Sequence, residues 1–179
     1  MKRMIGLIAL ALVVGAGVAS AQGTEHYKGA CGFHNIEAPA GIRWWLNDKL
    51  ALDAGLGFGS NEVANENFSH WALDLGLPIM MRSWDKVHVL VRPGILYTSQ
   101  EEDINPGPIL DKDNATSMTV GAEIEAEVFL ADNFSVSAAH GFAFVNNDPA
   151  GPGGSSTDWG TTGSNFTNIG FHIYVFGGK

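Results

Sequence analysis

The feature that most constrains the fold is the pattern of residues 41–58, GIRWWLNDKLALDAGLGF. It predicts two strands joined at Asn47-Asp48-Lys49, because Asn and Asp side chains hydrogen-bond the backbone of a turn and tolerate its conformations. In the second strand, large apolar residues alternate with small residues and one acid, which is the period of a β-strand. The apolar set is Leu50, Leu52, Ala54, Leu56 and Phe58, and the opposite set is Ala51, Asp53, Gly55, Gly57 and Gly59.

The character of these two faces indicates a membrane barrel. A soluble sheet covers its outer face with Lys, Glu, Thr and Gln, whereas the face opposite the leucines is mostly Gly and Ala. Small residues with an occasional charge fit the crowded interior of a narrow barrel, and the Leu and Phe face then fits lipid. We therefore expect Leu56→Arg to be costly and Gly57→Ser to be mild.

The same hairpin resembles the G-x-R-[YW]-W-L-[SN]-D-[KR]-L-A-L hairpin of small bacterial outer-membrane β-barrel proteins, the eight-stranded barrels often described as porin-like. The resemblance implies an all-β, eight-stranded antiparallel up-and-down transmembrane barrel in the outer membrane of a Gram-negative-type bacterium. Its implied partners are outer-membrane lipid and, during insertion, the barrel assembly machinery. The alternating aromatic residues of 171–176 resemble the C-terminal assembly signal of such barrels, although this chain ends in Gly177-Gly178-Lys179.

The rest of the chain continues the alternation. Strands are expected at 28–35, 39–46, 50–59, 68–80, 87–98, 115–130, 134–145 and 165–176, and the count of eight depends on accepting the first of them. Three short Asp-containing turns, at 46–50, 83–87 and 130–134, alternate with longer connections at 61–67, 99–114 and 146–164. Short turns at one rim and longer loops at the other are typical of an outer-membrane barrel, with the long loops at the cell surface.

The first 21 residues predict a secretory signal peptide. Lys2 and Arg3 precede an apolar stretch at 5–14, and Ala19-Ser20-Ala21 forms a small-residue cleavage site. The apolar stretch is shorter than the ~20 residues of a membrane-spanning helix. We expect cleavage after Ala21, which leaves one barrel domain at 22–179.

Charge and cysteine content exclude two classes of protein. The formal net charge is −9 and no cluster of Lys and Arg is present, so nucleic acid is not an expected partner. The single cysteine, Cys31, cannot form an internal disulfide, so stability must come from a closed hydrogen-bonded sheet or from a core.

Charged residues fall on the small-residue face of several predicted strands, and these form the candidate site. The set is Arg43, Asp53, Asp74, His88, Arg92, Glu123, Glu125 and Glu127. An eight-stranded barrel leaves an interior that side chains just fill, so we interpret the set as an ion-pair network that plugs the barrel, in preference to an ion path. Because five carboxylates face two guanidiniums, we expect water, a histidine such as His88 or His172, a raised pKa of some carboxylate, or a cation to compensate the remainder.

The sequence predicts no enzyme. Lipid A deacylases among the small barrels use a His and a Ser two residues apart on one lipid-facing strand, and no His-x-Ser occurs here. We expect no catalytic, cofactor-binding or metal-binding residues: the six histidines lack metal-ligand spacing, and residues 111–114 lack the Gly and Glu of a calcium loop. His140 lies on an apolar face, where we expect a bulge to turn it inward.

Three functional interpretations remain. The first is a closed barrel with a structural role or a surface-interaction role through its long loops, although no surface partner is indicated. The second is a soluble periplasmic lipocalin-like barrel that binds an apolar ligand inside, and the third is a narrow channel. The first two assign the faces of the strands in opposite ways.

Overall fold

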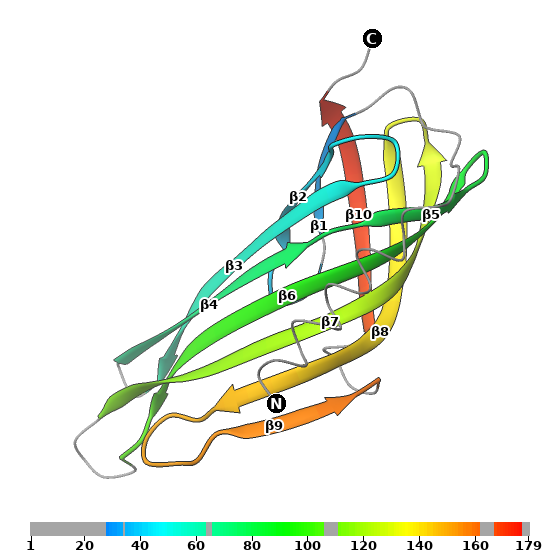
Figure 1. The fold of residues 1–179 in the computed structure, drawn as a ribbon. Helices are drawn as coiled ribbons and strands as arrows, with labels where there is room; N and C mark the ends of the chain where they lie inside the picture. The colour runs from blue at the N-terminus through cyan, green and yellow to red at the C-terminus, as the bar shows by residue number, and fades with distance from the viewer. Residues whose placement is uncertain (1–27, 34, 64–65, 106–110, 162–166, 177–179) are drawn as a thin grey trace.

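The computed structural model describes residues 28–33, 35–63, 66–105, 111–161 and 167–176, which form one closed antiparallel barrel (Figure 1). The predicted signal peptide and its cleavage site lie outside these residues. The strands are β1 (Gly29–Phe33), β2 (Ala40–Trp45), β3 (Ala51–Val63), β4 (Glu66–Gly76), β5 (Ile79–Ser83), β6 (Val87–Asp103), β7 (Lys112–Ala131), β8 (Phe134–Asp148), β9 (Ser156–Gly160) and β10 (Thr167–Phe176). In the described residues, no helix is long and apolar enough to cross a membrane.

Eight strand positions close the barrel, as predicted. The order around the barrel is β1-β2-β3-β4-β6-β7-β8-β10, and β10 pairs with β1 to close it. β4 and β5 together occupy one position, since both pair with β6. β9 pairs with residues 143–147 of β8, beyond the residues of β8 that pair with β10. The first strand is confirmed: β1 pairs with β2 and with β10.

The predicted faces of the strands are confirmed in the central hairpin. Leu52, Leu56 and Phe58 are 46%, 56% and 88% exposed, whereas Ala51 and Asp53 are almost fully buried. Exposed aromatic residues mark both ends of this apolar outer surface. They are Trp44, Trp84 and Phe176 near the short turns and Phe58, Trp71 and Trp159 toward the other end.

The three short turns define one end of the barrel, here called the short-turn rim (residues 46–50, 84–86 and 131–133). Asn47 shapes the first of them, because its side-chain oxygen accepts hydrogen bonds from the backbone N–H groups of Lys49 and Leu50 at 2.9 and 3.0 Å. β4 ends just before Pro78, which has no N–H to donate to a strand ladder. Pro93 lies opposite the same break, and its carbonyl accepts a 2.9 Å bond from the N–H of Leu77.

The longer connections are shorter than predicted, because the strands continue past the apolar surface. β3 and β4 run on to a Val63–Glu66 pair, where a polar loop at 61–67 was expected. β6 and β7 remain paired as far as Asp103 and Lys112, inside the loop expected at 99–114. The loop expected at 146–164 contains the end of β8 and all of β9. An antiparallel pair satisfies its own backbone whether its side chains are polar or apolar, so composition alone misplaced these ends. We call this end of the barrel, which the extended ends of β3–β4, β6–β7 and β8–β9 form, the hairpin rim.

Candidate functional site

All eight residues of the predicted charge network lie on the inner face of the barrel. Strand register aligns them: Arg43 of β2 is opposite Asp53 of β3. On β6 and β7, His88 and Arg92 are opposite Glu127 and Glu123. Residues directly opposite each other on paired strands share a face, as do residues two apart on one strand, so alternation in the sequence was sufficient to place the whole set.

Arg43 is the centre of the network and is 1% exposed. Its Nε and Nη2 donate to the two oxygens of Asp53, both at 2.9 Å. Its Nη1 and Nη2 donate to the two oxygens of Glu125 at 3.0 and 2.8 Å. One guanidinium thus makes two bidentate pairs, the strongest geometry available to a carboxylate.

Arg92 forms a second centre, one layer toward the hairpin rim. Its Nε donates to Asp53 Oδ2 at 3.0 Å and its Nη2 donates to Asp74 Oδ2 at 2.6 Å. Its Nη1 lies 4.0 Å from Glu123 Oε2. Asp53 therefore bridges the two arginines, and Glu123 has the longest ion pair to a guanidinium of the five carboxylates.

Glu127 accepts hydrogen bonds from neutral side chains in addition to its ion pair with Arg43. Its Oε1 accepts from Ser135 Oγ at 2.6 Å and from the Tyr174 hydroxyl at 2.9 Å. His172 Nδ1 lies 3.2 Å from the same oxygen. The sequence named His172 only as a possible counterion and did not single out Ser135 or Tyr174. Strand parity was the available signal, since His172 and Tyr174 alternate with the outward Phe171 and Ile173.

A cluster of buried, mainly apolar residues lies between this network and the short-turn rim. Its buried members are Ala30, Trp45, Ala51, Met80, Leu90 and Tyr174, with Phe129 packed against them. The cavity beside Arg43, Glu125 and His172 measures only about 10 Å³. That is about the smallest space that holds a water molecule, so the side chains around Arg43 leave little free volume between them.

Residues 35–38 form an inward-folded segment that the sequence did not predict. The chain leaves β1 after Phe33, and Asn35 and Ala38 become buried inside the barrel. Asn35 Oδ1 accepts a 2.7 Å bond from the N–H of Ala38, and Asn35 Nδ2 donates to Asp74 Oδ2 at 3.1 Å. The segment rests on the bare backbone of Gly57, where a Cβ would overlap the Glu37 carbonyl. Gly57→Ser is therefore not the mild change expected from the pattern alone.

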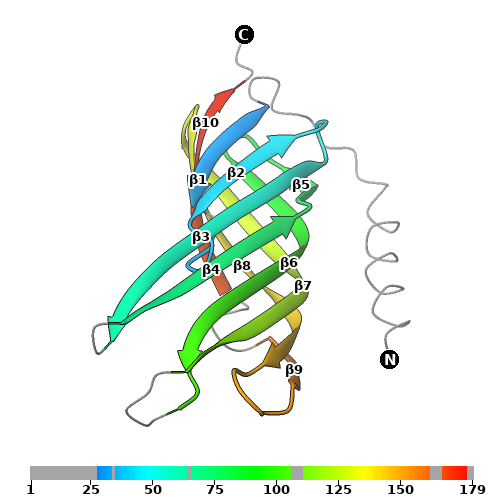
Figure 2. The same ribbon diagram turned by 90° about the vertical axis from the view of Figure 1, so that its left-hand side faces the viewer.

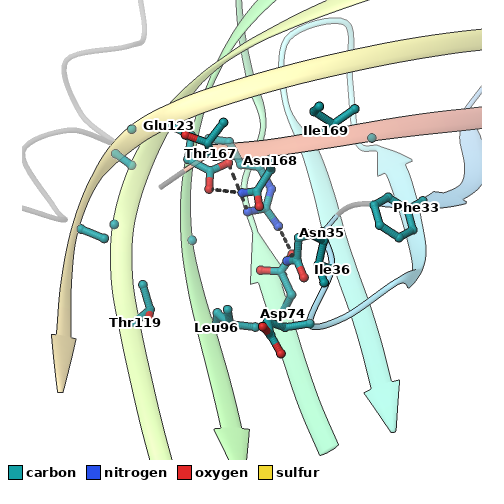
Figure 3. Close-up of a pocket in the computed structure, with 18 of the residues that line it drawn as sticks. Phe33, Asn35, Ile36, Asp74, Leu96, Thr119, Glu123, Thr167, Asn168 and Ile169 are labelled. Atoms are coloured by element: carbon teal, nitrogen blue, oxygen red, sulfur yellow. Dashed lines mark hydrogen bonds and ion pairs between the residues drawn. The ribbon is translucent and has the colours of Figure 1, made fainter. Parts of the chain in front are cut away.

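A larger cavity of about 720 Å³ lies between this segment, β6–β8 and β10. Figure 3 shows Asn168 beside Glu123 and Asn35 beside Asp74 in this cavity. Small residues supply much of its walls, namely Gly94, Gly121, Gly141, Ala143 and Gly170. The network thus ends at an open space on the side of the hairpin rim.

His140 is placed differently from expectation. It is exposed on the outer face, in regular register between Ile124 and Thr167, without the bulge that was expected to turn it inward. Its Nδ1 lies 2.8 Å from Thr167 Oγ1. Within the described residues, no cluster of three or more His, Cys, Asp or Glu side chains is arranged to hold a metal ion.

Comparison with known families agrees with this architecture. A family model described as "Outer membrane protein beta-barrel domain" matches residues 9–176, which is nearly the whole chain. The chain belongs to this family. It shows no significant match to a curated protein or to a solved structure.

Membership in the outer-membrane β-barrel family removes one of the three interpretations. A soluble periplasmic lipocalin-like barrel requires the apolar face to point inward, but the exposed leucines of β3 point outward and charged side chains line the interior. The protein is a transmembrane barrel of the outer membrane.

Proposed function

We propose that the protein is a non-enzymatic outer-membrane barrel with a plugged interior, whose role is structural or lies in surface interactions of its hairpin rim. The small free volume around Arg43 is the observation that carries the proposal. An apolar layer and the Arg43-centred layer both lie across the interior, and the space beside Arg43 on the side of Arg92 is only about 10 Å³. A narrow channel would need a continuous polar path through both layers.

The hairpin rim supports the surface role. Past the apolar surface, β3–β4 and β6–β7 carry mainly polar and acidic side chains, and they are tied together across strands. Glu101 Oε2 accepts a 2.8 Å bond from the N–H of Ser69. Lys112 Nζ lies 3.3 Å from Glu66 and 4.9 Å from the centre of the Phe68 ring. These contacts give the hairpins a defined shape that a partner outside the cell would meet.

The family's architecture supports an orientation with the hairpin rim at the cell surface and the short-turn rim in the periplasm. Outer-membrane lipid then surrounds the exposed apolar side chains. Recognition by the barrel assembly machinery is part of the same proposal, because β10 alternates outward Phe171, Ile173 and Val175 with inward His172 and Tyr174.

Planar-bilayer recording tests the plugged interior. We expect the reconstituted protein to show no steady conductance of porin size. Arg43→Ala, which empties the centre of the barrel, should raise the frequency of brief openings, while the outward Leu56→Ala should not. Steady conductance of the unmodified barrel would refute the plug and favour a channel.

Proteolysis of intact cells tests the orientation. Proteinase K should cut the stretch between β8 and β9, residues 149–155, and should spare the turn at 47–49. Cutting of residues 149–155 only after the outer membrane is permeabilised, or cutting of the turn at 47–49 in intact cells, would place the hairpin rim in the periplasm and would end the surface role.

A further inference from the structure

The wall of the barrel is incomplete on one side. β10 pairs with β1 only from Phe171 onward, whereas its residues 167–170 pair with β8 alone. β3 pairs with β2 only as far as Leu56, and its residues 57–63 pair with β4 alone. Figure 2 shows β1 and β2 ending well short of β3. In the described part of the chain, a lateral window therefore lies between these two unpaired edges.

The cavity of about 720 Å³ lies at this window. Its lining combines inward residues, such as Thr119 and Gly170, with Phe33, Ile36 and Phe171, which face the outside. Ile36 is 81% exposed and Phe171 is 42% exposed, so the mouth of the cavity is apolar and continuous with the lipid-facing surface. The volume falls within the ~300–1,000 Å³ typical of small-molecule sites.

The inner end of the cavity is polar and has an excess of negative charge. Asn168 Nδ2 donates to Glu123 Oε1 at 2.6 Å, and the Glu123 side chain is 16% exposed. Arg92 is already engaged with Asp53 and Asp74 and lies 4.0 Å from Glu123. Glu123 Oε2 thus faces the cavity with only a long ion pair, which leaves it able to accept a hydrogen bond from a ligand.

We propose that this cavity binds a single-chain amphipath that enters sideways from the outer membrane. The alkyl chain lies in the window against Phe33, Ile36 and Ile169, and a cationic, hydrogen-bond-donating head group reaches the Glu123 carboxylate. Charge decides against an anionic head such as that of a fatty acid, because Asp74 and Glu123 flank the one nearby guanidinium. The ligand enters from the bilayer because the mouth of the cavity opens on the apolar outer surface and not at the hairpin rim. The inference extends the proposed function, since a laterally filled site requires no path through the barrel.

Photolabelling in phospholipid nanodiscs tests this site. The probe is dodecylamine with a diazirine at the end of its chain, and the adducts are mapped by mass spectrometry. We expect adducts to concentrate in residues 33–37 and 167–171. Thr119→Trp, which fills the cavity from β7, should abolish this concentration, as should Leu96→Trp from the opposite position on β6. Ile124→Trp, on the outer face of the same β7 strand, serves as the matched control and should not change it.

The head group has its own test. Glu123→Gln should reduce competition by unlabelled dodecylamine about tenfold, the effect of losing a hydrogen bond to a charged group. Dodecanoate should compete poorly with the dodecylamine probe for labelling of the unmodified protein, which carries Glu123. Heat-modifiable gel migration verifies that each variant is folded. Adducts spread evenly around the outer surface, or adducts unchanged by both tryptophan variants, would overturn the proposal; equal competition by dodecanoate would overturn the assignment of the head group. Planar-bilayer conductance is a separate readout, so failure of this site and failure of the plugged barrel are distinguishable.

Discussion

Replacement of Arg43 by methionine should destabilise the barrel strongly, because it removes the charge that compensates the carboxylates around it. Met retains much of the apolar length of the side chain, so the change is mainly electrostatic. Asp53 keeps its 3.0 Å bond to Arg92, whereas Glu125 loses both of its hydrogen bonds to Arg43. Glu127 also loses an ion pair at 3.5 Å. Breaking a buried pair from one side costs about 3–5 kcal/mol, and we expect a loss of unfolding free energy in this range.

Urea unfolding in phospholipid vesicles, followed by tryptophan fluorescence, measures this loss. Glu125→Gln alone should cost far less, because it removes one of five interior carboxylates and leaves Arg43 paired with Asp53. The double variant, Arg43→Met with Glu125→Gln, should recover much of the Arg43→Met loss, since the uncompensated charge is then gone. A loss below about 1 kcal/mol for Arg43→Met, or strict additivity in the double variant, would show that water and not Arg43 balances these carboxylates.

Three further predictions concern the outer face, the inward-folded segment and the hairpin rim. Leu56→Arg should lower the unfolding free energy by about 2–4 kcal/mol, the cost of a cation on the lipid face near the midplane, and equal tolerance of Leu56→Arg and Leu56→Ala would contradict the assignment of that face. Gly57→Ser should cost about 1–3 kcal/mol in the same assay, because the new Cβ displaces residues 35–38, whereas Gly154→Ser, with open space around it, should cost nothing measurable. The pKa of Asp113 is held below its usual value by hydrogen bonds from the backbone N–H groups of Gly151 and Asn114, so this contact should persist above pH ~3.9 and be lost as pH falls through the lower folded-state value. An NMR titration of the Gly151 amide should show a midpoint below ~3.9, and a midpoint at or above that value would contradict the contact.

Alternation along single strands was enough to predict the barrel and the members of its charge network. The residues Arg43, Asp53, Asp74 and Glu127 each stand at an inward position of a strand whose other face is apolar, so parity alone brings them together. Parity does not say which carboxylate meets which guanidinium. That choice depends on the register between β2 and β7, which lie across the barrel from each other, and no local pattern records it.

The inward-folded segment and the window could not be read from the sequence, because both depend on contacts between distant residues. Residues 28–35 were expected as one strand, but Asn35 turns the chain by accepting a bond from Ala38 and reaches Asp74 on β4. The segment fits only where Gly57 leaves the neighbouring backbone bare. The same turn ends β1 at Phe33, before the expected end of that strand. On the hairpin-rim side of the turn, the edges of β10 and β3 are therefore left unpaired. Gly55 and Gly57 therefore have a second role, which alternation along β3 does not indicate. Because they lack a Cβ, the segment at 35–38 fits against β3, and the lateral window lies beside that segment.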